Sequence, residues 1–125
     1  MIEPPVRSYR DLRVWQRAMD LAVKTYDLTR AFPREEQFAL TSQARRAATS
    51  IAANVAEGHG RATRPAYLNF LRIAQGSLKE LETHVLISVR VGFVSASASE
   101  PLLSEADELG RMLRALIVSL EAPRR

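Results

Sequence analysis

Hydrophobic residues recur every three or four positions along four segments of the chain, which is the spacing of one face of an α-helix. None of these segments shows the two-residue alternation that indicates a β-strand. The pattern predicts helices over about residues 11–30, 34–57, 64–90 and 99–121. Because the connections are short, we expect an all-α, antiparallel up-down-up-down four-helix bundle, with residues 1–125 forming a single domain.

Proline, glycine and serine residues set the predicted helix boundaries. Pro33 ends the first pattern, because proline disfavours helix at the preceding residue and suits the first turn of a new one. Gly58 and Gly60 are expected to adopt the left-handed conformation that ends the second helix. The fourth helix is expected to begin near Ser97 or Ser99.

Apolar stripes identify the expected core. The main stripe of the first helix includes Trp15 and Tyr26, for which core packing is expected, since base stacking would require exposed rings. A second stripe adjoins it and runs through Val14, Ala18, Leu21 and Leu28. The strongest periodicity lies in the third helix, through Tyr67, Leu71, Ala74, Leu78, Leu81 and Val85. In the fourth helix the core line is Leu102, Ala106, Leu109, Leu113, Leu116 and Leu120.

The second helix has two lines of residues on one face. The core line is Leu40, Ala44, Ala47 and Ile51. The line beside it is polar and consists of Gln43, Arg46, Ser50, Asn54 and Glu57. Arg45 points away from both lines, so solvent, a neighbouring subunit and phosphate are all open to it. Small residues beside polar ones let another backbone approach closely, which indicates a docking surface rather than a catalytic one.

Several residues on the second and third helices are candidates for structural or subunit contacts. Arg46 and Glu82 are expected to form a buried or half-buried ion pair, the alternative being that Arg46 contacts a ligand or RNA. Gly76 interrupts a strong helix, which favours a close backbone approach, first to another subunit and second within the chain. Asn54 and Glu57 are further candidates for oligomer contacts.

The charge of the chain is basic but mixed. Eighteen Lys and Arg residues against fourteen acidic ones give a net charge of +4 and a pI near 10.1. This balance permits nucleic-acid binding without requiring it. Sixteen of the eighteen basic residues are arginine, which suits phosphate recognition but also follows from a genome rich in G and C.

Several classes of protein and site lack their usual signals. Cysteine is absent, so no disulfide, thiolate zinc site or cysteine nucleophile is expected. No apolar run approaches the roughly 20 residues that span a bilayer, and the N-terminus lacks the apolar core of a signal peptide. We therefore expect a soluble cytoplasmic protein without a membrane partner.

Enzymatic chemistry is not expected. A di-metal carboxylate bundle needs Glu-x-x-His pairs, and neither His59 nor His84 has a glutamate three residues before it. The sequence also lacks three other enzyme signals. These are the arginine-to-histidine spacing of helical-bundle ribonucleases, the GxxxxGK[ST] phosphate-binding loop and the serine elbow of hydrolases. No metal or cofactor is therefore predicted. His59, close to Arg61 and Arg64 in a glycine-flanked loop, is the one polar cluster worth testing for chemistry.

Four sequence blocks together resemble a known family. They are YRDLRVWQRAMDLA, FPREEQFALTSQARRAATSIAANVAEGHGR, YLNFLRIAQGSLKELETHV and GRMLRALIVSLE. Their order and spacing are similar to those of the four-helix bundle family that includes proteins encoded by intervening sequences within bacterial 23S rRNA genes. The resemblance covers almost the whole chain.

The resemblance implies an antiparallel four-helix bundle that commonly assembles as a ring-like homopentamer. A relative in this family is the accessory variability protein of diversity-generating retroelements, whose positively charged barrel is associated with nucleic acid and a reverse transcriptase. RNA or DNA is thus an implied partner, as is a reverse transcriptase if the gene is associated with a retroelement. The implied nucleic-acid-binding positions are Arg45, Arg46, Arg61, Arg64 and Arg72.

Two functional hypotheses follow from the sequence. The first is a non-enzymatic, oligomeric binding module acting as a nucleic-acid or ribonucleoprotein accessory, whose affinity should fall steeply with salt. The alternative is a structural or protein-interaction scaffold with no nucleic-acid role. Both expect self-association.

Overall fold

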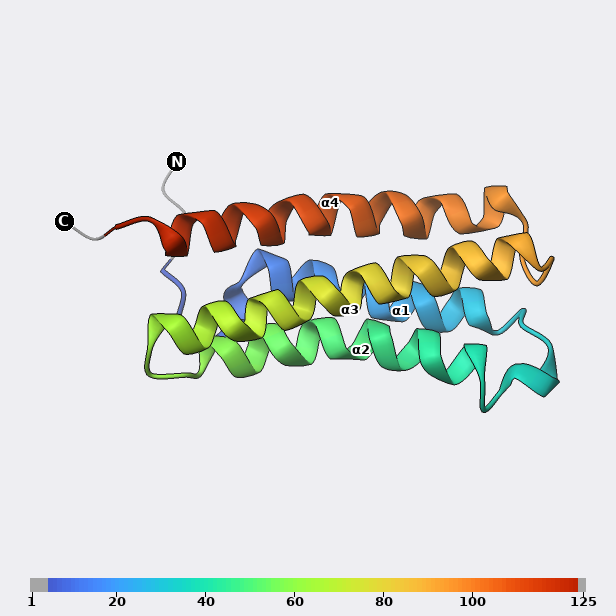
Figure 1. Cartoon of the computed structure of the whole chain (residues 1–125), viewed down its shortest axis with the longest axis horizontal. Helices are drawn as coiled ribbons and strands as arrows, with labels where there is room; N and C mark the ends of the chain where they lie inside the picture. The colour runs from blue at the N-terminus through green and yellow to red at the C-terminus, as the bar shows by residue number, and fades with distance from the viewer. Residues whose placement is uncertain (1–4, 124–125) are drawn as a thin grey trace.

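The computed structural model describes residues 5–123 and contains four long α-helices and two 3₁₀ turns. The helices are α1 (Arg13–Thr29), α2 (Leu40–His59), α3 (Arg64–Arg90) and α4 (Ala96–Glu121), and the turns are η1 (Tyr9–Asp11) and η2 (Arg34–Glu36). Successive helices run in opposite directions, with the α2–α3 connection at one end and the other two connections at the opposite end (Figure 1). Each helix packs against two neighbours, in the order α1, α2, α3, α4 and back to α1. The predicted all-α four-helix bundle is confirmed.

One apolar core runs along the axis of the bundle. The stripes predicted on the second, third and fourth helices supply most of it, and Ile51, Leu71, Leu81 and Leu109 have no exposed surface. A second cluster of Phe32, Leu40 and Val94 closes the end at which the α1–α2 and α3–α4 connections lie. None of the helices described within residues 5–123 is both long and apolar enough to cross a lipid bilayer.

The core face of α1 differs from the main stripe predicted for it. The buried residues are Val14, Ala18, Leu21, Thr25 and Thr29, so the adjoining stripe is the true core face. Thr25 and Thr29 are polar, so the sequence pattern does not mark this face as buried. Each hydroxyl donates to the carbonyl four residues earlier, and the threonines can therefore be buried with their hydrogen bonds satisfied. Trp15 is only partly buried, and the expectation that Tyr26 lies in the core is wrong, since 39% of Tyr26 is exposed.

The chain does not enter α2 at the predicted position. Residues 34–36 form the 3₁₀ turn η2, and α2 begins only at Leu40. The Glu36 carboxylate accepts a hydrogen bond from the Leu40 amide at 3.2 Å, which satisfies a donor that the new helix leaves free. This break in the helix lets both Phe32 and Leu40 reach Val94 in the end cluster.

The fourth helix begins earlier than predicted. Ser95 is its N-cap and accepts a hydrogen bond from the Ala98 amide at 3.0 Å, so neither Ser97 nor Ser99 is the cap. Pro101 lies inside the helix rather than in its first turn. The sequence around Ser97 contains several serines, and local spacing alone does not distinguish which of them caps the helix.

The left-handed backbone predicted for Gly58 and Gly60 is wrong, and Gly58 instead allows α2 and α3 to approach closely. Gly60 has a φ of −79°, and within residues 5–123 only Gly92, with a φ of 84°, has the left-handed backbone. Gly58 is instead a buried residue inside α2. A Cβ atom added there would lie 2.7 Å from Cβ of Phe70 on α3, closer than real Cβ contacts come. Gly58 is therefore required by helix packing.

This close packing yields a pair of glycine substitutions with opposite effects. Gly58→Ala should lower the free energy of unfolding by about 1–3 kcal/mol, because the added methyl group overpacks against Phe70. Gly76→Ala should raise it by about 0.5–1 kcal/mol, because its Cβ would meet nothing within 4 Å and alanine favours a helix interior. Urea denaturation followed by circular dichroism measures both. Equal effects of the two substitutions would contradict the close approach of α2 to α3 at Gly58.

Candidate nucleic-acid interface

The arginines implied as nucleic-acid contacts do not form one patch. Arg45 and Arg46 lie in the first half of α2, whereas Arg61 and Arg64 flank the α2–α3 connection at the opposite end of the bundle. The fifteen residues from Arg46 to Arg61 correspond to roughly 22 Å along a helix axis. The third helix carries Arg72 on a different side, facing α4.

Arg45 is engaged by α1 instead of being free in solvent. Its Nε donates a hydrogen bond to Oγ1 of Thr29 at 2.8 Å, and its guanidinium lies 4.5 Å from the centre of the Tyr26 ring. The side chain is half-buried. Arg45 thus links α2 to α1, and this intramolecular role reduces its availability for phosphate.

The predicted ion pair between Arg46 and Glu82 is wrong. The Arg46 guanidinium donates to the Ser42 hydroxyl at 3.3 Å, and Glu82 pairs with Lys79 at 3.0 Å. Arg46 instead shares a shallow surface recess with Glu80. Because each helical residue turns the chain by about 100°, Glu80 and Glu82 point to very different sides of α3, and only Glu80 faces the Arg46 side.

The polar line on α2 forms hydrogen bonds at the boundary with α3. The hydroxyls of Ser50 and Ser77 lie 2.8 Å apart. Asn54 donates through Nδ2 to the Ser50 carbonyl at 2.8 Å and to the Ser50 hydroxyl at 2.9 Å. The close partner of this face is therefore α3 itself. A subunit contact at Asn54 or Glu57 stays a prediction.

The two arginines beside the α2–α3 connection also have partners within the chain. Arg61 pairs with Glu57 at 2.5 Å and lies 4.8 Å from the centre of the Phe70 ring. Arg64 donates to the Ala122 carbonyl at 3.0 Å, which ties the end of α4 to the start of α3. Both side chains therefore have contacts within the chain at this end of the bundle.

His59 packs against an aromatic ring in this region. Its ring meets that of Tyr67 edge-on at 5.8 Å. Burial raises the pKa of the Tyr67 hydroxyl above its ordinary value. Within residues 5–123, no group of three or more acidic or histidine side chains is placed to hold a metal ion.

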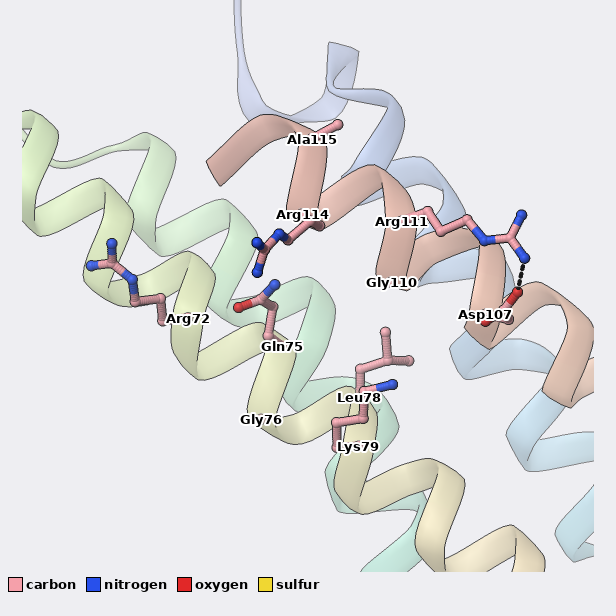
Figure 2. A pocket seen from close by; sticks show the side chains of 10 residues that line it. All are labelled: Arg72, Gln75, Gly76, Leu78, Lys79, Asp107, Gly110, Arg111, Arg114 and Ala115. Carbon is pink, nitrogen blue, oxygen red and sulfur yellow. Dashed lines mark hydrogen bonds and ion pairs between the residues drawn. The ribbon is translucent and has the colours of Figure 1, made fainter. Parts of the chain in front are cut away.

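A basic groove lies between α3 and α4 (Figure 2). Its volume is about 690 Å³, and four cationic side chains and one acidic side chain line it together with small and apolar residues. The lining residues are Arg72, Gln75, Gly76, Leu78, Lys79, Asp107, Gly110, Arg111, Arg114 and Ala115. We call this the α3–α4 groove.

The helical spacing on both walls explains why these residues meet. Arg72, Gly76 and Lys79 are four and three residues apart, so they share one face of α3. On α4, Gly110 and Arg114 are four residues apart and lie on the face opposite. A Cβ on Gly76 would meet nothing within 4 Å, so the expectation of close packing at Gly76 within the chain is wrong. The glycine instead leaves the groove open.

The cations of the groove differ in how they are paired. Arg72 pairs with Glu121, Arg111 with Asp107, and Lys79 with Glu82. Arg114 has no hydrogen-bond or ion-pair partner among the described residues. Its guanidinium projects into the gap between the helices beside Gln75 (Figure 2). A groove with four cations, one of them unpaired, is suited to an anionic ligand such as phosphate.

Sequence reasoning found Arg72 but missed Lys79, Arg111 and Arg114. The shared face of Arg72, Gly76 and Lys79 is visible from spacing, and Gly110 with Arg114 is a comparable signal on the last helix. Neither face alone indicates a groove. Pairing the two requires knowledge of the register between α3 and α4, which the sequence does not contain.

Fold and groove together define a small all-α bundle that presents basic side chains between two helices. A family model matches residues 10–115 of the chain and describes the 23S rRNA-intervening sequence proteins. The chain belongs to this family. Its fold is similar to a crystal structure of a protein with unknown function from the S23 ribosomal protein family of Bacteroides thetaiotaomicron. That match has 23% sequence identity and a TM-score of 0.75, and it covers 83% of this chain and 97% of the other. No curated protein sequence matches the chain.

The contrast between Arg45 and Arg46 can be tested with two double-mutant cycles. The pair Arg45→Met and Thr29→Val should show a coupling energy of about 1 kcal/mol, because a half-buried hydrogen bond joins the two side chains. The pair Arg46→Met and Glu82→Gln should show a coupling energy near zero. Unfolding free energies of the single and double variants give both values. Strong coupling in the second cycle would contradict the finding that Glu80, and not Glu82, lies on the side of α3 that faces Arg46.

Proposed function

We propose that this protein is a non-enzymatic, oligomeric binding module that binds the phosphate backbone of nucleic acid in the α3–α4 groove. The observation that carries the proposal is the unpaired Arg114 in a recess with three further cations. A guanidinium offers several donors in a planar fork that matches phosphate oxygens. The membership of the 23S rRNA-intervening sequence family is consistent with an RNA or DNA partner but names none.

The ion pairs of the groove do not oppose this proposal. Arg72 and Glu121 are about half exposed, and exposed ion pairs contribute only about 0–1 kcal/mol. A phosphate can therefore replace Glu121 on Arg72 at small cost. The carboxylates then act only as weak competitors, and binding depends on the salt concentration because each phosphate contact releases counterions from the nucleic acid.

Self-association is the second part of the proposal, and an apolar groove between α1 and α2 supports it. This groove has a volume of about 540 Å³ and includes Met19, Val23 and Tyr26 on α1 with Thr49 and Ala53 on α2. Val23 is 60% exposed. Exposed apolar side chains beside small ones provide a surface on which a helix of a second copy can pack closely. A homopentamer is the assembly that the family resemblance implies.

The same apolar groove also favours the alternative function. A scaffold that only self-associates or binds another protein would need this surface and would leave the α3–α4 groove unused. If the gene is associated with a retroelement, a reverse transcriptase is the protein partner to consider. Nucleic-acid binding by the α3–α4 groove distinguishes the two functions.

Replacement of groove arginines should weaken nucleic-acid binding. We expect Arg114→Ala to lower the affinity for nucleic acid about tenfold. Arg72→Ala should lower the affinity by a smaller factor, because Arg72 already has a carboxylate partner. Arg34→Ala is the matched control, since Arg34 is an exposed arginine on η2 outside the groove and its loss changes the net charge equally. Fluorescence anisotropy with labelled structured RNA and duplex DNA measures the affinities.

The complementary change is Glu121→Gln, which should tighten binding by freeing Arg72. Circular dichroism and light scattering establish that the variants keep their fold and their assembly. An Arg34→Ala effect as large as that of Arg114→Ala would show attraction by net charge alone. The absence of binding at low salt would leave the scaffold function as the better account.

A charge placed in the apolar groove should dissociate the assembly. Val23→Glu would bury a carboxylate between two copies, so we expect a shift to monomer. Val118→Glu is the control, because Val118 is also exposed but lies on α4 outside the α1–α2 groove. Light scattering coupled to size-exclusion chromatography gives the mass of each. A wild-type monomer at micromolar concentration, or an unchanged assembly in Val23→Glu, would refute this interface.

A further inference from the structure

We infer that the α3–α4 groove selects double-helical nucleic acid and binds it through the sugar-phosphate backbone without reading the bases. This inference rests on the proposed function and adds the class of ligand. It follows from three features of the groove, namely the chemistry of its lining, its shape and the arrangement of its cations.

The lining of the groove has no surface on which a base can stack. None of its ten residues is aromatic. Proteins that bind single strands without sequence preference rely on aromatic side chains, each contributing about 1–3 kcal/mol by stacking on a base. The exposed aromatic residues Phe38 and Tyr26, at 90% and 39% exposure, lie outside this groove. The groove thus lacks the principal contact that a flexible single strand requires.

The shape of the groove excludes direct reading of base edges in a duplex. Base edges are read by one helix or ribbon that enters the major groove, which is about 12 Å wide. Here the cations flank a recess between two helices, each about 10–12 Å across with its side chains. A recess of this kind cannot enter the major groove, but it can receive the ridge that one phosphate backbone forms on the outside of a duplex.

The cations are placed along the recess on both walls. Arg72 and Lys79 on α3 are seven residues apart, or about 10 Å, and Arg111 and Arg114 lie on α4. A rigid duplex presents phosphates to both walls without being ordered first. Counterion release also favours the duplex, since each phosphate contact contributes a salt slope of about 0.9 for B-DNA and about 0.7 for a single strand.

The test compares a 20-base-pair DNA duplex, a second duplex of unrelated sequence and a 20-nucleotide oligo(dT) strand by fluorescence anisotropy between 50 and 200 mM salt. Four phosphate contacts predict a slope of log K against log[salt] of about −3.6 for the duplexes, or a loss of about 150-fold over this range. Arg114→Ala should reduce the slope by about 0.9, whereas Arg34→Ala should leave it unchanged. The two duplexes should bind within about twofold of each other, and oligo(dT) at least tenfold more weakly.

The outcomes separate this inference from the proposed function. Tighter binding of oligo(dT) than of the duplexes, or a strong preference between the two duplex sequences, would overturn the inference while leaving nucleic-acid binding intact. Binding of none of the three probes at 50 mM salt would overturn the proposed function and this inference with it. A duplex slope that does not change in Arg114→Ala would place the binding surface outside the α3–α4 groove, and would overturn both that part of the proposed function and this inference.

Discussion

The close packing of α2 against α3 is the constraint on which the rest of the bundle depends. Gly58 leaves no room for a side chain beside Phe70, and the Ser50 and Ser77 hydroxyls meet at 2.8 Å. Helices α1 and α4 complete the bundle by packing against this pair through core residues such as Leu21 on α1 and Leu109 on α4. The fourth helix is joined to α1 by long side chains, as in the pair of Arg17 with Glu108 at 2.8 Å.

Two grooves are exposed on the surface of this bundle. On one side, α3 has Gly76 where it faces α4, and an added Cβ there would meet nothing within 4 Å, so this part of their shared surface is an open recess. On the other side, the core of α1 is centred on Leu21 and Thr25, which leaves the stripe through Val23 and Tyr26 at the surface. One recess is basic and the other is apolar, so the fold offers two chemically different surfaces that need not compete for a partner.

The sequence predicts the helices better than it predicts their ends or their orientation. The third helix has the predicted bounds, 64–90, because its apolar line is long and its ends carry Thr63 and Gly92. The apolar pattern does not indicate the core face of α1, because Thr25 and Thr29 are polar residues that are buried with their hydroxyls bonded within the helix. The start of α2 depends on contacts of Leu40 with the distant Val94, which no local pattern contains.

The candidate site is harder to predict than the fold because it depends on which residues lack partners. The sequence does not show which arginines have a partner in the folded chain, so Arg45, Arg61 and Arg114 cannot be distinguished from it. In the folded chain, Arg45 is held by Thr29 and Arg61 by Glu57, whereas Arg114 projects into an open recess. Gly76 supplies no side chain and so leaves part of this recess open. The register between α3 and α4 therefore decides which arginine is available to a ligand.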